Sequence, residues 1–107
     1  MKHQIETDTL KWKEGKVKNF FGKELLNLPH GTLKLMKVAP LSSYPLHQHP
    51  KHTEYAYVLE GKPHIVIGNE ETDARPGDFF IFPKDTQHAI SNPTSVFCRM
   101  LVGAIAE

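Results

Sequence analysis

The chain has 107 residues, 39% of them hydrophobic and 23% charged, which excludes a long disordered polar chain and fits one domain, residues 1–107, around a single core. The 13 Lys and Arg residues nearly balance the 12 Asp and Glu residues, so we expect no partnership with nucleic acid or with a membrane surface driven by bulk charge. A single cysteine (Cys98), an N-terminus without an apolar signal core and the lack of a membrane-length apolar run predict a cytoplasmic protein without an internal disulfide.

Prolines and glycines separate short apolar runs along the whole chain, and this spacing predicts an all-β fold. Alternating, β-branched and aromatic residues predict strands at 17–26, 32–38, 55–59, 64–67, 72–75, 78–82, 88–91 and 95–105. Residues 1–30 then form N-terminal strands and an extension, and 95–105 form the closing strand. Many short strands joined by tight turns are typical of a sandwich or a small barrel.

The strand at 55–59 is apolar on both of its faces. Side chains alternate along a strand, so one face carries Glu54, Ala56 and Val58, and the other carries Tyr55, Tyr57 and Leu59. Both faces must be covered, by a second sheet, a terminal segment or a partner chain. Because an exposed apolar stripe is an aggregation liability, we expect a homodimer that covers the tyrosine face.

Histidines are concentrated just before this strand. His47 and His49 are two residues apart, and on a strand they would share one face. Glu54 opens the next strand, and an antiparallel neighbour could place its carboxylate beside them. Two imidazoles and a carboxylate suit a divalent first-row metal. The alternative is three polar surface residues near a turn. His88, alone after the turn 83–87, is more typical of a polar residue at a strand end.

Together these segments resemble the two sequence motifs of the cupin superfamily, in its small single-domain form. The first motif has the form G-x5-H-x-H-x(3,4)-E-x6-G, and the second has the form G-x5-P-x-G-x2-H-x3-N. Both fall within residues 41–92. Most motif positions match at the required spacing: His47, His49, Glu54, Gly61, Gly77, Pro83, His88 and Asn92.

Two positions depart from the motifs. Leu41 and Asp85 stand where the motifs have glycine. Aspartate tolerates the left-handed backbone conformation better than most residues, so we expect the turn at Asp85 to survive. Neither departure removes a metal ligand of the family.

The resemblance implies a cupin-type double-stranded β-helix, a jelly-roll barrel with one divalent transition metal inside its open end. It implies the ligands His47, His49, Glu54 and His88. Three nitrogens and one oxygen leave coordination positions open for water or substrate. Members of the family use Mn, Fe, Ni, Cu, Co or Zn, and this ligand set does not choose among them.

We expect a small-molecule ligand in a pocket beside the metal. Ala56 and Val58 are small and share the face of Glu54, so they are expected to leave space, with Met36 and residues 79–82 as an apolar wall. Tyr44 is expected to line the pocket. For three further residues the sequence leaves more than one interpretation open. His52 is a rim histidine, an alternative ligand or a proton carrier at the pocket mouth. His64 has a structural partner, lies on the surface or lies near the ligands, and Arg99 forms a salt bridge or binds an anionic substrate. Cys98 is interpreted as a small buried residue.

Three functions are compatible with these residues. The first is a metal-dependent enzyme with dioxygenase-like, oxidoreductase chemistry on a small organic molecule. It is favoured because no acid or base besides Glu54 is evident, and oxygen chemistry depends more on the metal than on protein acids and bases. The second is a non-catalytic module that binds or senses a metal or a small molecule. The third is an isomerase or epimerase that needs no metal, which a complete ligand set argues against.

Overall fold

The computed structural model describes residues 3–107 as two antiparallel sheets and one short 3-10 turn at Thr7–Thr9. The larger sheet has the strand order β1-β2-β3-β10-β5-β8, and the smaller has the order β4-β9-β6-β7. The strands are β1 (Lys13–Glu14), β2 (Phe20–Leu28), β3 (Gly31–Val38), β4 (Ser42–His47), β5 (His52–Glu60), β6 (His64–Ile67), β7 (Glu70–Asp73), β8 (Phe79–Phe82), β9 (His88–Asn92) and β10 (Cys98–Ala106). The predicted all-β architecture is confirmed. No helix in this part of the chain is long and apolar enough to cross a bilayer.

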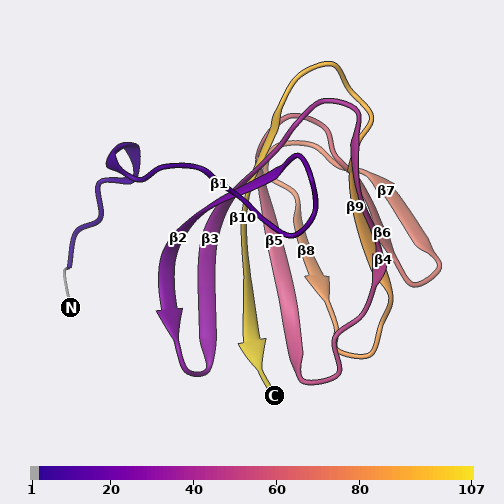
Figure 1. The fold of residues 1–107 in the computed structure, drawn as a ribbon. Helices are drawn as coiled ribbons and strands as arrows, with labels where there is room; N and C mark the ends of the chain where they lie inside the picture. The colour runs from indigo at the N-terminus through magenta and orange to yellow at the C-terminus, as the bar shows by residue number, and fades with distance from the viewer. Residues whose placement is uncertain (1–2) are drawn as a thin grey trace.

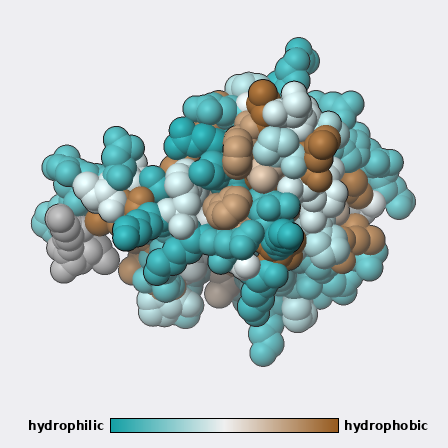
Figure 2. All heavy atoms as spheres, turned by 45° about the horizontal axis from the view of Figure 1, so that its top comes forward, coloured by the Kyte–Doolittle hydropathy of each residue, from teal (hydrophilic) through white to brown (hydrophobic). Residues whose placement is uncertain are grey.

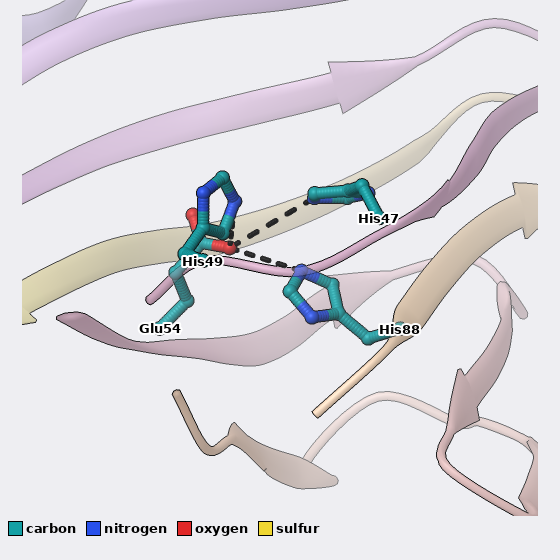
Figure 3. A group of neighbouring side chains, drawn as sticks. All are labelled: His47, His49, Glu54 and His88. Carbon is teal, nitrogen blue, oxygen red and sulfur yellow. Dashed lines mark ion pairs between the residues drawn. The ribbon is translucent and has the colours of Figure 1, made fainter. Parts of the chain in front are cut away.

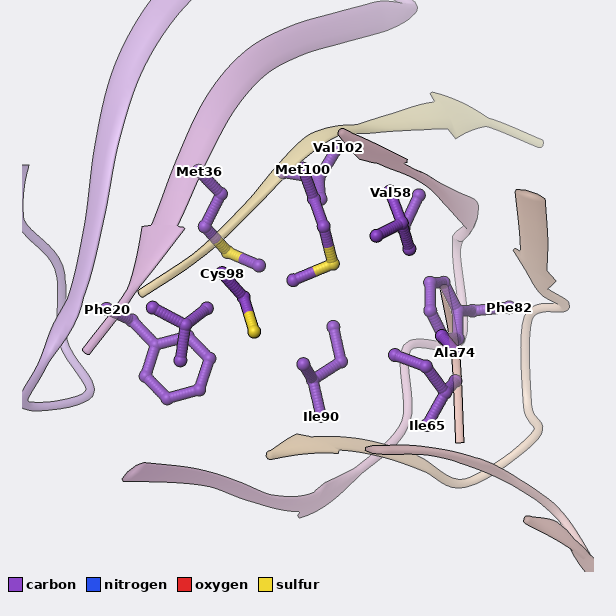
Figure 4. Packing of buried hydrophobic residues seen from close by; sticks show 12 residues of the cluster. Phe20, Met36, Val58, Ile65, Ala74, Phe82, Ile90, Cys98, Met100 and Val102 are labelled. Atoms are coloured by element: carbon purple, nitrogen blue, oxygen red, sulfur yellow. The ribbon is translucent and has the colours of Figure 1, made fainter. Parts of the chain in front are cut away.

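The two sheets pack face to face, with β4, β9, β6 and β7 forming one wall and the larger sheet forming the other (Figure 1). Side chains from both walls interdigitate in a single core (Figure 4). Strand β5 shows the alternation behind this arrangement: Ala56 and Val58 are fully buried, whereas Tyr57 is 39% exposed on the outer face. The predicted alternation along this strand is confirmed, and its outer face is left partly uncovered.

Strand β10 lies inside the larger sheet, paired with β3 on one side and β5 on the other. Its inward residues Cys98 and Met100 are fully buried, and Val102 is 9% exposed, while Arg99 lies half-buried on the outer face. Burial raises the pKa of the Cys98 thiol, although a backbone hydrogen bond from Lys62 works in the opposite direction. Cys98 is therefore a buried core residue, as predicted, and not a reactive thiolate.

Both residues that replace motif glycines adopt the left-handed backbone conformation. Leu41 has a φ of 57° and Asp85 a φ of 64°. The turn at Asp85 survives, as predicted. Gly61 keeps its motif identity for two reasons: its φ is +85°, and a Cβ there would lie 2.7 Å from Cys98 Sγ.

Strand boundaries differ from the predictions mainly near the N-terminus. Strand β2 begins at Phe20 because the preceding residues form a loop in which Asn19 has a left-handed φ of 72°. Gly22 pairs regularly with Met36, and the irregularity of this strand lies between Glu24 and Leu26. Strand β1 was not predicted, because two residues give no readable alternation. The closing strand begins at Cys98.

Candidate metal centre

Two of the four predicted ligands face each other within the smaller sheet. His47 ends β4, His88 begins β9, and the two are register partners whose ring centroids lie 4.1 Å apart. The register between the strands shifts between Tyr44 and His47, around Pro45, which has no N–H for a ladder bond. Such an irregularity re-aims the next side chain, and here His47 joins His88 in the interior.

Glu54 comes from the opposite sheet. It lies on β5, which pairs with β10 and β8, whereas β4 pairs with β9. The expectation that an antiparallel neighbour carries the carboxylate to the histidines is wrong. Residues 48–51 connect the two sheets, so the carboxylate meets the histidines across the barrel interior. Phe82, the register partner of Glu54, packs on His88 with ring centroids 4.6 Å apart and closes the inner side of the site.

His49 does not share a strand with His47, contrary to the prediction. Strand β4 ends at His47, and His49 lies in the connection just before Pro50. The carbonyl oxygen of His49 accepts a hydrogen bond of 2.8 Å from the backbone N–H of Asp85. This bond ties the connection to the turn before β9, and the rings of His47 and His49 still lie 5.0 Å apart.

The four side chains converge on one point (Figure 3). Glu54 Oε1 lies 3.0 Å from His88 Nε2, 3.1 Å from His49 Nε2 and 4.0 Å from His47 Nε2. One ligand atom from each residue lies within 4.8 Å of all the others. Ligands about 2.1 Å from a shared metal stand about 3.0 Å apart at right angles and about 4.2 Å apart when opposite. The donor set therefore fits one divalent ion.

Backbone carbonyls orient two of the imidazoles. His47 Nδ1 lies 2.8 Å from the carbonyl oxygen of Pro45, and His88 Nδ1 lies 3.3 Å from that of Thr86. A carbonyl only accepts, so each Nδ1–H donates, and Nε2 of each ring is directed toward Glu54. A hydrogen bond from the remote nitrogen fixes the tautomer and the ring orientation that metal binding requires.

The charge states inside the cluster also suit a cation. Burial works to raise the pKa of Glu54, but the hydrogen bond from His88 and the charges of His49, His88 and His52 outweigh it, so the pKa lies below its ordinary value. Burial lowers the pKa of His49 and outweighs the opposing charge of Glu54. An ionised carboxylate and a neutral imidazole are the forms that bind metal.

The other polar residues singled out from the sequence occupy different places. His52 stacks on His49 with centroids 4.4 Å apart but lies outside the converging group. Tyr44 packs against His47 at 4.5 Å and lines the cavity, as expected. His64 binds Asp73 and Glu71, and Arg99 binds Glu60 at 3.3 Å on the outer face of the sheet. For His64 and Arg99 the structural interpretation is the correct one.

A cavity of about 90 Å³ adjoins the cluster, and a groove of about 790 Å³ shares part of its wall. Met36 and Phe82 supply apolar wall, as expected. Ala56 and Val58 do not: both are fully buried in the core and line neither space. Phe79 is 56% exposed on the outer face, which corrects its expected place in the wall. The small cavity is lined instead by residues of β3, β4, β5, β8, β9 and β10.

The sequence interpretation did not place Lys34, Tyr55, Ile90, Val102 or Gly103 in this wall. Lys34 lines both the small cavity and the larger groove. It stands in an alternating strand outside both motifs, where a lysine ordinarily indicates a solvent-facing position. Lys34 is indeed exposed, and its parity with Met36 was the one available signal that it also borders the cavity.

The sequence model of the cupin domain matches residues 34–103, most of the chain. A curated relative, an uncharacterized protein of Methanocaldococcus jannaschii, is 34% identical over 56 residues, which are 52% of this chain. The matched segment spans 45% of that relative, so the chain covers about half of its length.

Solved structures with the same fold cover nearly all of the chain. A predicted oxalate decarboxylase of Thermotoga maritima superposes with a TM-score of 0.89 at 18% identity, covering 97% of this chain and 99% of the other. KdgF of a Halomonas species gives 0.86 at 20% identity, covering 96% and 93%. A cupin sugar phosphate isomerase of Silicibacter pomeroyi gives 0.85 at 20% identity, covering 95% and 74%. At these identities the likeness establishes the fold alone, and the predicted jelly-roll barrel is confirmed.

Proposed function

This chain belongs to the cupin domain family, and from that membership and its converging ligands we propose that it is a metal-dependent enzyme acting on a small organic molecule by dioxygenase-like chemistry. The observation that carries the proposal is the cavity that opens directly onto His47, Glu54 and His88. A site built only for stability would be closed by its four protein ligands, whereas in five- or six-coordination three nitrogens and one oxygen leave one or two positions for a substrate.

His47, His49, Glu54 and His88 would hold one divalent metal, with Mn, Fe, Ni, Cu, Co and Zn as candidates. When bound, a metal of this class supplies Lewis acidity and, if redox-active, electrons for reaction with O₂. The protein contributes an apolar wall from Met36 and a ring from Tyr44 beside the ligands, which would orient the substrate and exclude water.

The groups around the cavity favour oxygen chemistry over acid–base chemistry. Glu54 is the one carboxylate among the described residues that line the small cavity, and it is committed to the ligand set. A decarboxylation or an isomerisation needs a further acid or base beside the substrate. Two of the structurally similar proteins are described as a predicted oxalate decarboxylase and a sugar phosphate isomerase, but their identities of 18% and 20% carry no activity over to this chain.

The second candidate is a module that binds a metal or a small molecule and turns nothing over, and the small size of the adjoining cavity favours it.

We also propose a cytoplasmic homodimer. Support for pairing comes from the edge strand β8, where Phe79 and Ile81 are each 56% exposed beside Tyr57. On the face in Figure 2, hydrophobic residues appear as separate patches among hydrophilic ones.

Elemental analysis of protein purified without added metal tests the site. We expect one equivalent of a transition metal, lost in His49→Ala and retained in the matched control His64→Ala, which removes a histidine outside the cluster. Oxygen uptake by the metal-loaded protein is then measured with phenols, diketones, thiols and organic acids. Uptake that disappears in His49→Ala supports the enzyme. Metal binding without uptake for any substrate class supports the binding module.

A further inference from the structure

We propose that the cavity beside the four ligands accepts a small anionic molecule, whose carboxylate or phosphate group pairs with Lys34. The inference rests on the proposed function, because it names the substrate class for the same site. The expected ligand carries an oxyanion, and the second measurement distinguishes a carboxylate from a phosphate.

Lys34 is directed to the interior side of the larger sheet. It lies on β3 two residues before Met36, which is 7% exposed in the core, and its register partner on β10 is Val102. Together with His47, Glu54 and His88 it lines the small cavity, and it is the one Lys or Arg among the described residues that does so. Its side chain remains exposed to solvent, so a permanent cation stands at the open side of the space that the ligand cluster faces.

A glycine on the neighbouring strand gives this side chain room. Gly22 is the register partner of Met36 on β2, and a Cβ built at Gly22 would lie 3.5 Å from Lys34 Cδ. The aliphatic part of Lys34 thus passes over a position without a side chain. A lysine that packs its stem in this way presents its ammonium with less conformational freedom than a lysine free in solvent.

No carboxylate within residues 3–107 neutralises this ammonium. Glu24 is its register partner on β2, yet no acidic oxygen lies within 4.0 Å of Lys34 Nζ. Other long cations of the chain do have partners: Arg99 Nη1 lies 3.3 Å from Glu60, and Lys84 Nζ lies 4.0 Å from Glu107. Lys34 is available for a charge supplied from outside the chain.

The wider groove carries an excess of positive charge, the same sign as the ammonium of Lys34. Besides Lys34, it is lined by Lys11, Lys13, Lys16 and Lys23, against the carboxylates of Glu14, Glu24 and Glu54. Glu14 already accepts a hydrogen bond of 2.8 Å from the backbone N–H of Asn19. Setting Glu54 aside as a ligand, lysines outnumber acids in this wall, and a cleft of one sign attracts ligands of the opposite sign.

The net charge of the metal-bound site also favours an anionic ligand. Three neutral imidazoles and one carboxylate leave a divalent ion with one net positive charge. With Lys34 in the same cavity, a neutral ligand would leave two positive charges facing each other across apolar walls. An anion compensates them, and a charge-assisted hydrogen bond to the ammonium fixes its orientation.

The experiment compares 3,4-dihydroxybenzoate with its uncharged isostere, 3,4-dihydroxybenzamide. Each is titrated into cobalt-loaded protein while the visible absorption of the metal is followed. We expect the wild-type protein and Lys34→Arg to bind the acid about tenfold more tightly than the amide. In Lys34→Gln the preference should fall below about twofold, with affinity for the amide unchanged. Lys37→Gln is the matched control, since it removes the same charge from the outer face of the same strand. An unchanged preference in Lys34→Gln, or no preference in the wild type, overturns the proposal.

A second measurement does not depend on the metal. Inorganic phosphate and benzoate are titrated separately into metal-free protein, and amide chemical shifts are recorded. Changes for either anion centred on residues 33–36 that vanish in Lys34→Gln and persist in Lys37→Gln support an oxyanion site, and the anion that causes them identifies its source. Changes that persist in Lys34→Gln, or no change there with both anions, overturn it. Loss of metal binding or of oxygen uptake alone would instead count against the proposed function.

Discussion

The backbone N–H of Asp85 donates a hydrogen bond of 2.8 Å to the carbonyl oxygen of His49. This contact joins the two halves of the candidate metal centre, because Asp85 lies in the turn that leads to His88, and His49 lies in the connection that leads to Glu54. His49 has no ladder bond to hold it, since β4 ends at His47. The turn of the second motif therefore holds a ligand of the first.

Replacing Asp85 by valine should weaken metal binding. Its φ of 64° is tolerated by aspartate and favoured by glycine, but it is a strong outlier for a β-branched residue. Asp85→Val should shift the turn, break the bond to His49 and lower zinc affinity by about tenfold or more, as is typical for losing a group that supports a ligand. Asp85→Gly is the matched control and should bind zinc like the wild type in calorimetry. Equal zinc affinity in the two folded variants would contradict this role.

The ligand set could be predicted from sequence because motif spacing encodes it. What spacing could not supply is the route by which the ligands meet. His49 was expected on a strand and lies in a loop, and Glu54 was expected on a strand paired with that of the histidines but reaches them from the opposite sheet. Alternation specifies which face a residue occupies within one strand, whereas these contacts depend on how two sheets close on each other.

The cavity wall was predictable only in part, for the same reason. Met36 was placed correctly from its apolar alternation, but Lys34 was missed although it shares that face. Gly103 gives a second case: a Cβ there would lie 2.1 Å from the carbonyl oxygen of Thr32 and 2.4 Å from the hydroxyl of Tyr55. The ring of Tyr55 occupies that space, and its hydroxyl donates a hydrogen bond of 2.9 Å to the carbonyl oxygen of Thr32. A contact spanning three strands leaves no local sequence signal.

Leu41→Gly should stabilise the protein. Leu41 has a φ of 57° and is 79% exposed, so it bears the cost of a left-handed backbone without burying its side chain. Relief of about 1–2 kcal/mol of backbone strain, against about 0.5–1 kcal/mol of added chain entropy for glycine, leaves a net gain of roughly 0.5–1 kcal/mol in the free energy of unfolding.

Urea unfolding measures this gain. Leu46→Gly serves as the control, because Leu46 is also exposed, at 53%, but lies in β4 with an ordinary strand conformation. There the substitution should lower stability by roughly 0.5–1 kcal/mol or more. A Leu41→Gly variant that is no more stable than the wild type would show that the positive φ carries no strain.

His64 should make stability depend on pH. Its Nδ1 lies 2.8 Å from Asp73 and its Nε2 lies 2.9 Å from Glu71, and these hydrogen bonds raise the pKa of His64 above its ordinary value of 6.5. Because the folded state holds the proton more tightly, the stabilisation is fully present below the unfolded pKa and is lost as pH rises through the folded pKa. Asp73 is 90% exposed, so the effect is modest and screened by salt.

The measurement compares urea midpoints of the wild type and His64→Gln across this pH range. The wild type should be the more stable at low pH, and the gap should narrow as pH rises. The register partner of His64 on β9 is Ser91, which does not titrate, so the acids of β7 account for the effect. Asp73→Asn should reduce the gap at low pH. A gap that stays constant or widens with pH would contradict the assignment.

The edge strand β8 should mediate pairing of two chains. Its outward residues Phe79 and Ile81 are each 56% exposed, and their register partners Tyr57 and Tyr55 continue the same apolar face. Fully burying a side chain as large as Phe or Ile contributes about 1.5–3 kcal/mol, so a symmetric contact that buries both residues from each copy gains several such contributions.

Light scattering should give a mass near twice the 12.2 kDa of the chain at micromolar concentrations. Ile81→Glu should shift it toward the single-chain mass, because the carboxylate would lose its hydration in the interface. Leu46→Glu introduces the same charge at a 53% exposed apolar residue of the other sheet and should leave the mass unchanged. A single-chain mass for the wild type, or an Ile81→Glu variant that still pairs, would rule out this edge as the interface.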